Sequence, residues 1–184
     1  MNDQNKWNQK YSEKLQDMKV PEPNPRLKKI ASYLSGGKAL DLACGLGANS
    51  IFLAQLDYQV EAIDISDVAI GHLQEQAAQN KLSINAKVCD LTNKKLGENG
   101  QFDLIVITYY LDRSLFPALK DLIKENGYFF LETFYQSPAT KRQGVSERFK
   151  LQSKELLHEF GDWKVVFFEE HEQEGRQTIF CQKQ

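Results

Sequence analysis

The stretch from 38 to 49 constrains the fold of this chain more than any other part of it. It begins as a short apolar run, carries Asp41, turns at Gly45 and Gly47, and leads directly into a helical pattern. Glycine permits a sharp turn and lets a ligand approach the main chain. The first N–H groups of the following helix have no partner inside the helix, so they can bind a ligand's polar atoms. The stretch predicts a strand–turn–helix unit. On its own it fits an ordinary turn as well as a ligand site.

Apolar runs and helical patterns alternate along the rest of the chain. Five runs predict strands, at 38–43, 58–64, 83–89, 102–108 and 128–134. The helical patterns that lie between or after them fall at 48–57, 67–80, 113–125 and 154–160. We expect Ser66 and Ser153 to cap two of these helices, and Asn126-Gly127 to end a third.

The end of the chain differs from this alternation. Two further apolar runs, at 163–168 and 178–181, are joined by a segment too short for a crossover helix, so these strands should be antiparallel. The prediction is therefore an α/β fold: a doubly wound, mostly parallel seven-stranded sheet with helices on both faces and a C-terminal antiparallel hairpin.

The length of 184 residues fits one domain. Trp7 and Tyr11 recur at helical spacing within a predicted helix at 4–18, and a proline-rich connector precedes a second predicted helix at 25–35. We expect a single domain, 1–184, in which 1–35 supplies N-terminal helices that cover a ligand site and 36–184 forms the α/β core.

Composition excludes several classes of function. The net charge of −2 gives no general attraction to nucleic acid or to an anionic membrane. The polar start lacks an apolar signal core, and no apolar run is long enough to cross a bilayer. Three cysteines without C-x-x-C spacing argue against a disulfide framework and a zinc site. We expect a cytoplasmic protein without metal, a monomer or weak homodimer with no nucleic-acid or membrane partner.

Polar residues follow successive strands of the predicted sheet, at the edge where open parallel sheets bind ligands. Asp64 ends the second strand and can accept both hydroxyls of a ribose; Asp90 ends the third and can accept a hydrogen bond from an adenine amino group. Tyr109 and Tyr110 follow the fourth strand, at the reactive end of such a ligand. Each acid alone is more often a helix cap or a solvated strand end. Together with Asp41 they predict a nucleoside site.

The glycine pattern separates two kinds of nucleoside ligand. A dinucleotide fingerprint, G-x-G-x-x-G, needs a third glycine where this chain has Ser50. A carboxylate directly before the turn is also unfavourable beside a pyrophosphate, whereas it suits a cationic ligand.

The stretch resembles motif I of the Rossmann-like S-adenosylmethionine-dependent methyltransferases, [DE]-x-G-x-G-x-G, with Ala43 in place of the first glycine. The resemblance covers about 38–134, including Leu131-Glu132-Thr133-Phe134. At the flanks, Trp7–Tyr11 is similar to W-x-x-[RK]-Y and Pro23–Leu27 to P-N-P-x-L of small bacterial methyltransferases, including the tellurite-resistance type. That type carries a His-Arg pair between the last two strands, and the separation of His171 from Arg176 here argues against tellurite as substrate.

The resemblance implies an enzyme that transfers a methyl group from S-adenosylmethionine to a small-molecule acceptor and releases S-adenosylhomocysteine. The acceptor would be a thiol, amine, hydroxyl or soft metalloid oxyanion, methylated by in-line displacement, with Tyr109 and Tyr110 orienting it. In this family the N-terminal helix folds over the methionine end of the cofactor. The predicted cofactor site consists of Trp7, Tyr11, Asp41, Ala43, Gly45, Gly47, Asn49, Asp64, Ile65, Asp90 and Leu91.

Other interpretations remain open at this point. A nicotinamide-dependent oxidoreductase leaves Asp41 and Asp90 unexplained, a non-catalytic cofactor-binding module needs an activity assay to exclude it, and a nucleic-acid methyltransferase conflicts with the charge balance. No side chain is well placed as an indispensable base, since Glu132 and His171 are more remote than the two tyrosines. The basic segment 136–150 either covers an anionic acceptor or is a solvated loop.

Overall fold

The computed structural model describes residues 2–17, 21–92, 100–140 and 144–184. Its contacts divide the chain into two compact units, 1–98 and 99–184. Most of the predicted loop at 92–101 lies outside the described residues, as do Lys141 and Arg142 of the basic segment. None of the helices in the described ranges has the length and apolar character needed to cross a bilayer.

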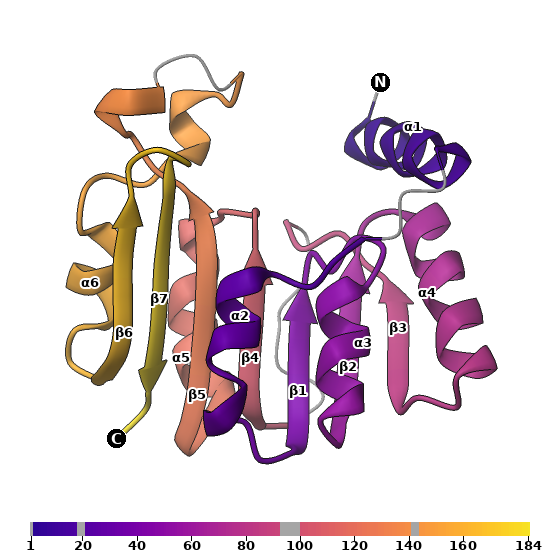
Figure 1. Ribbon diagram of the computed structural model, residues 1–184, viewed down its shortest axis with the longest axis horizontal. Helices are drawn as coiled ribbons and strands as arrows, with labels where there is room; N and C mark the ends of the chain where they lie inside the picture. Colours follow the sequence, from indigo (N-terminus) through magenta and orange to yellow (C-terminus); the bar gives the residue numbers. More distant parts are fainter. Residues whose placement is uncertain (1, 18–20, 93–99, 141–143) are drawn as a thin grey trace. The chain divides into compact units, whose positions relative to one another are not determined.

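The first unit contains a parallel sheet in the order β3-β2-β1. Its strands are β1 (Gly37–Leu42), β2 (Tyr58–Asp64) and β3 (Ile84–Val88). Helix α3 (Ala48–Gln55) packs on β1 and β2, and α4 (Asp67–Gln79) packs on β2 and β3 (Figure 1). The four strand and helix predictions at 38–43, 48–57, 58–64 and 67–80 are confirmed to within two residues at each end.

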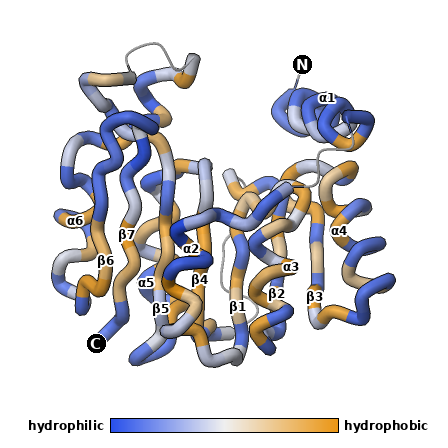
Figure 2. The backbone as a smooth tube through the Cα atoms, in the orientation of Figure 1, coloured by the Kyte–Doolittle hydropathy of each residue, from blue (hydrophilic) through white to orange (hydrophobic). Residues whose placement is uncertain are grey.

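Two helices precede this sheet. Helix α1 (Asp3–Gln16) has no buried residue and is mostly hydrophilic along its length (Figure 2), yet it packs against α4. Helix α2 (Pro25–Lys29) begins at Asn24, whose side chain accepts hydrogen bonds from two backbone N–H groups, as predicted. It is shorter than the predicted helix of 25–35, because the chain tightens into the 3₁₀ turn η1 (Ala31–Tyr33).

The second unit contains four strands in the order β4-β5-β7-β6. They are β4 (Phe102–Thr108), β5 (Ile123–Phe134), β6 (Lys164–His171) and β7 (Arg176–Gln182). Strand β5 is parallel to β4, and β7 is antiparallel to both of its neighbours. The predicted C-terminal hairpin is confirmed, although both of its strands are longer than expected.

Short helices accompany these strands. They are η2 (Arg113–Leu115), α5 (Phe116–Leu122), η3 (Pro138–Thr140), η4 (Glu147–Phe149) and α6 (Glu155–Phe160). Phe160 of α6 lies at the centre of an aromatic cluster, with ring centroids 4.6 Å from Phe129, 5.4 Å from Phe116 and 5.6 Å from Trp163. This cluster holds α5 and α6 against the sheet.

Three local predictions in this unit are wrong. The helix predicted at 113–125 ends at Leu122, because Ile123 is fully buried as the first residue of β5. Asn126, with φ of 64°, lies inside β5, where the pairing with β4 is irregular, so Asn126-Gly127 forms a break in the strand ladder rather than a helix end. Ser153 does not cap α6, since its hydroxyl donates to Glu170 (3.1 Å).

Along the whole chain the strand order is β3-β2-β1-β4-β5-β7-β6. The predicted fold class, a mostly parallel seven-stranded sheet that ends in an antiparallel hairpin, is confirmed.

Candidate functional site

Every second residue of the turn after β1 has a left-handed backbone conformation. Ala43, Gly45 and Gly47 have φ of 54°, 55° and 82°, a region that favours glycine. A Cβ atom on Gly47 would lie 2.3 Å from a methyl carbon of Leu73, so only glycine fits there. Ala43 adopts the same region at some cost in strain. The turn thus brings its backbone close to α4 and starts α3 at Gly47.

Asp64 fixes this turn from the end of β2. Its Oδ2 accepts a hydrogen bond from the Gly45 N–H (2.8 Å), and its Oδ1 accepts one from the Ser66 N–H (2.9 Å). Ser66 Oγ in turn accepts from the Ala69 N–H (3.1 Å), which confirms Ser66 as the cap of α4. Burial raises the pKa of Asp64, and the N–H groups that it accepts from oppose that shift. Asp64 therefore ties the glycine turn to the start of α4.

Asp41 lies inside the same region and is 0% exposed. Its Oδ2 accepts a hydrogen bond from Ser50 Oγ (2.6 Å), while its Oδ1 has no partner among the described residues. Burial raises the pKa of Asp41 to about 7, with Asp64 adding to the effect and Ser50 opposing it. A buried carboxyl with an unpaired oxygen is costly unless a cation or donor reaches it. The site is therefore suited to a positively charged group.

Helix α1 contacts the turn from outside the sheet. A Cβ atom on Gly45 would lie 2.8 Å from Tyr11 Oη, so the Tyr11 ring lies against the turn. Burial, followed by the negative charge of Asp64, raises the pKa of Tyr11 above its usual range. Trp7 stacks on Tyr11 with centroids 5.7 Å apart. Tyr11 therefore lies against the glycine turn, and Trp7 lies against Tyr11.

Asn8 anchors this helix, and sequence analysis missed it. Its Nδ2 donates to Asp67 Oδ1 (2.5 Å), and its Oδ1 accepts from Ser66 Oγ (2.6 Å). Asn8 lies between the two aromatic residues of the W-x-x-[RK]-Y segment. The sequence around Asn8 did not indicate this role, because its partners lie nearly sixty residues further along the chain.

The other predicted cofactor residues lie in this first unit. Asn49 is buried, and its Oδ1 accepts from the Asn24 N–H (2.8 Å), so it also holds the connector before α2. Asp90 is half-buried and its Oδ1 accepts from the Thr92 N–H (2.9 Å) and hydroxyl (2.7 Å). Ile65 is half-buried and Leu91 is buried.

The second unit holds a separate polar group at the end of β4. Tyr109, with φ of 60°, donates its backbone N–H to Glu132 O (2.8 Å), and its hydroxyl donates to Glu132 Oε1 (3.2 Å). Thr178 donates its hydroxyl to Glu132 Oε2 (2.7 Å). Glu132 is 1% exposed. Glu132, which we expected to lie farther from the reactive end of the ligand than the two tyrosines, is in direct contact with Tyr109. Tyr110 is half-buried.

Arg176 completes this group, and sequence analysis gave it no role. The first residue of β7, it pairs in register with Phe134, the last residue of β5. Its guanidinium carbon lies 3.7 Å from the Phe134 ring centroid and 4.8 Å from that of Tyr109. Its Nη1 is buried and has no hydrogen-bond partner among the described residues.

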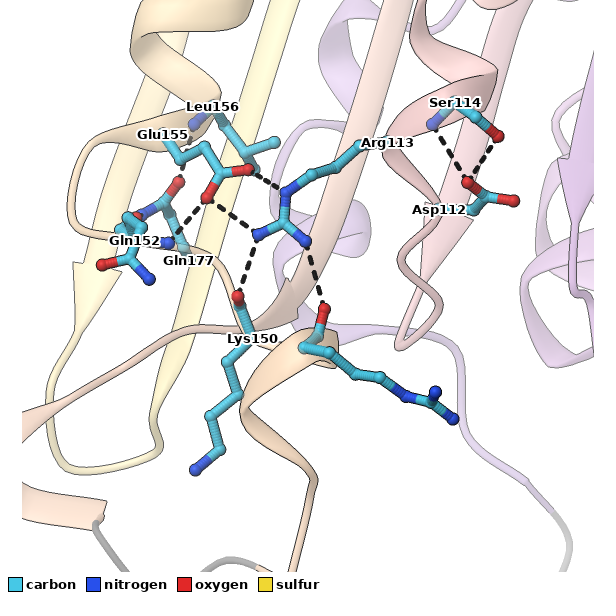
Figure 3. A network of polar contacts seen from close by, with 9 residues as sticks. Asp112, Arg113, Ser114, Lys150, Gln152, Glu155, Leu156 and Gln177 are labelled. Atoms are coloured by element: carbon cyan, nitrogen blue, oxygen red, sulfur yellow. Dashed lines mark hydrogen bonds and ion pairs between the residues drawn. The ribbon is translucent and has the colours of Figure 1, made fainter.

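The described part of the basic segment is held by Arg113 (Figure 3). Arg113 donates Nε and Nη2 to the carboxylate of Glu155, which begins α6, and its two Nη groups to the carbonyls of Arg148 (3.1 Å) and Lys150 (3.0 Å). Burial raises the pKa of Glu155, but its hydrogen bonds from Arg113 and from a backbone N–H outweigh burial and lower the pKa overall. The Lys150 side chain is buried and pairs with Glu147 (2.9 Å). This end of the segment is therefore an ordered structure.

Comparison with known proteins places the chain in a family. It matches the family described as "Tellurite resistance protein TehB" over residues 3–179. The "Probable S-adenosyl-L-methionine-dependent methyltransferase TehB" of Haemophilus influenzae is 27% identical over 152 residues, which cover 80% of this chain and 53% of that protein. The chain thus spans about half the length of the curated relatives it matches.

Solved structures show the same fold. The crystal structure of TehB from Haemophilus influenzae has a TM-score of 0.78 at 23% identity, covering 88% of this chain and 62% of that one. Magnesium protoporphyrin IX methyltransferase from Synechocystis, solved with bound S-adenosylhomocysteine, has a TM-score of 0.72 at 14% identity and covers 98% of both chains. The fold is therefore the Rossmann-like methyltransferase fold, and the chain belongs to the TehB family.

Proposed function

We propose that this protein is an S-adenosylmethionine-dependent methyltransferase that acts on a small-molecule acceptor. Asp41 supplies the main support. Its buried, unpaired Oδ1 stands beside a backbone turn that only small residues can form, and the methionine part of S-adenosylmethionine carries a cationic ammonium group. A carboxylate oxygen that has no partner among the described residues and a ligand that carries a cation fit one another.

The remaining residues of the first unit fit the other parts of the cofactor. Asp64 would accept the ribose hydroxyls, since each of its oxygens accepts a hydrogen bond from a backbone N–H and has a second lone pair. Asp90 would accept from the adenine amino group, with Ile65 and Leu91 on either side of the ring. Tyr11 and Trp7 on α1 would cover the methionine end and exclude water.

When bound, the cofactor supplies a methyl group already activated by a sulfonium, so the protein contributes by positioning and by excluding water. Tyr109 would orient the acceptor. Because its hydroxyl donates to Glu132, its oxygen is polarised to accept a hydrogen bond from an N–H, O–H or S–H of the acceptor. We infer an amine, thiol, hydroxyl or soft metalloid oxyanion as acceptor, and no obligatory base.

We also propose that 1–184 works as one methyltransferase domain, a monomer or weak homodimer in the cytoplasm. The family match over 3–179 extends across both units and supports a single functional domain. A nicotinamide dinucleotide is the weaker alternative, because its pyrophosphate would be placed near the negative charge of Asp41.

A thermal-shift comparison tests the cofactor. S-adenosylhomocysteine at 100-fold over its dissociation constant should add about 2.7 kcal/mol to the free energy of unfolding. NAD and NADP at the same concentrations should leave the melting temperature unchanged. Stabilisation by a dinucleotide, with none by S-adenosylhomocysteine, would reverse the two assignments. Transfer of a labelled methyl group to a panel of acceptors then separates an enzyme from a non-catalytic binding module.

A further inference from the structure

Arg176 is a cation whose hydrogen-bonding groups are incompletely used. Its Nη1 is buried without a partner among the described residues. The rings of Phe134 and Tyr109 attract its charge, but a ring face does not replace the hydrogen bonds that a guanidinium edge makes in water. Burying such a group is costly unless an anion or acceptor meets it. Two other basic residues of this unit differ from Arg176, since Arg113 pairs with Glu155 and Lys150 pairs with Glu147.

The position of Arg176 in the sheet points to a ligand. Strand β7 runs antiparallel to β5, so its first residue lies beside Phe134 at the carboxyl end of β5. Tyr109 follows the carboxyl end of the neighbouring strand β4. Open α/β sheets bind ligands at this edge. Arg176 and Tyr109 are thus adjacent at the edge of this unit where a substrate is expected.

We propose that Arg176 binds a carboxylate or phosphate group of an organic acceptor, while Tyr109 orients the separate atom that is methylated. This inference rests on the proposed methyltransferase function. The guanidinium fork matches both anions bidentately. The anion serves for recognition and does not react, because the buried acid Glu132 contacts the Tyr109 hydroxyl and would repel an oxyanion placed there. A thiol, amine or hydroxyl that carries its own proton suits that position, so this inference removes the metalloid oxyanion from the acceptors proposed above.

The first test measures anion binding by the full-length protein without any acceptor. Inorganic phosphate and, separately, acetate are titrated while the Nε–H signals of the arginines are followed by NMR. Arg176→Met assigns the signal of Arg176. Arg148→Met is the matched control, since Arg148 is exposed in the same unit and also lies on an aromatic ring, that of Phe149.

We expect the chemical shift of the Arg176 Nε–H to change with anion concentration until it saturates, and that of the Arg148 Nε–H to remain constant. A stationary Arg176 signal, or equal movement of both arginines, would overturn the proposal. Retained S-adenosylhomocysteine binding in Arg176→Met shows that this variant is folded. If that variant is not folded, Arg176→Lys keeps the charge but loses the fork, and phosphate should then bind at least several-fold more weakly.

The second test uses pairs of acceptors that differ in one anionic group, such as thioglycolate and 2-mercaptoethanol, with release of S-adenosylhomocysteine as the readout. The anionic member should be preferred, and Arg176→Met should raise its KM about ten- to a hundred-fold with a much smaller change in kcat. Arg176→Lys should give an intermediate KM for the anionic acceptor, and Arg148→Met should leave that KM unchanged. Preference retained in Arg176→Met, or methylation of tellurite and selenite alone, would contradict the inference. If no acceptor is methylated, the methyltransferase proposal fails and the phosphate titration alone decides the anion site.

Discussion

Asp41 gives the most direct test of the cofactor site, because its ionisation should control cofactor affinity. The pKa of this buried carboxyl is raised to about 7. A cationic ammonium group favours the ionised form, so binding must remove the proton wherever Asp41 is still protonated. Affinity for S-adenosylhomocysteine should therefore be constant above about pH 7 and fall by up to about tenfold for each pH unit below it.

Stability of the free protein should show the opposite trend. The folded-state pKa of Asp41, about 7, lies above the ordinary value of 3.8 for an aspartate side chain. The folded state therefore binds more protons than the unfolded state between these two pH values, and the free energy of unfolding falls as pH rises through that window. Saturation with S-adenosylhomocysteine should reduce this fall, because the ammonium group compensates the ionised carboxyl.

The decisive variant is Asp41→Asn, which keeps the shape and cannot ionise. At pH 8 it should bind S-adenosylhomocysteine about ten- to a hundred-fold more weakly, corresponding to the loss of a charged hydrogen bond of roughly 1.5–3 kcal/mol. Its affinity should not vary between pH 5 and 8, and at pH 5 it should approach that of the unsubstituted protein. Asp57→Asn, at an exposed acid of the same unit, is the control.

Calorimetric titration at five pH values measures all of these quantities. Equal affinity of Asp41→Asn and the unsubstituted protein at pH 8 would show that Asp41 does not bind the ammonium group. A pH dependence that persists unchanged in Asp41→Asn would assign the titration to another group.

Three further predictions concern other parts of the protein. Gly47→Ala should lower the melting temperature and abolish tight cofactor binding, since its Cβ would lie 2.3 Å from a Leu73 methyl carbon at φ of 82°; Leu73→Ala should restore part of the stability. Arg113→Met should make the chain at 144–151 more susceptible to limited proteolysis, because Arg113 binds two of its carbonyls, while cofactor affinity stays unchanged. Tyr109→Phe should slow single-turnover methyl transfer only by the equivalent of about 1 kcal/mol, the value of one orienting hydrogen bond. A loss beyond about a thousand-fold would identify a general base.

The sequence predicted best those features that depend on neighbouring residues. Strands β2 and β4 have the predicted bounds, 58–64 and 102–108, because apolar residues alternate with polar ones at the start of β2 and form a nearly continuous run in β4. Ser66 was predicted correctly as the cap of α4 because its hydroxyl and the Ala69 N–H that donates to it lie only three residues apart in the sequence. The position of Asp64 at the end of β2 was also predicted correctly from its neighbours in the sequence.

Features that depend on distant pairing could not be predicted. Arg176 meets Phe134 only through the register of β7 on β5, and that register is set across more than forty residues. Ile123 fits the face of a helix as well as it fits a strand, and the pairing of β5 with β4 decides between them. The role of Asn8 could not be predicted, because its hydrogen-bond partners come close to it only when α1 packs against α4.

Ser50 departs from the dinucleotide fingerprint, and in the structure it is a partner of Asp41. In the sequence it counts only as the missing third glycine of a dinucleotide fingerprint. In the structure its hydroxyl donates to Asp41 Oδ2 at 2.6 Å, and this hydrogen bond opposes the rise in the pKa of that acid. A glycine at this position would remove the hydroxyl that donates to this buried carboxyl, leave only the hydrogen bond from the backbone of residue 50, and favour the neutral form of Asp41. Ser50 therefore keeps Asp41 closer to ionisation at neutral pH, as binding of a cationic ligand requires. Ser50→Gly should shift the pH at which cofactor affinity begins to fall to a higher value, a result that calorimetric titration can check beside Asp41→Asn.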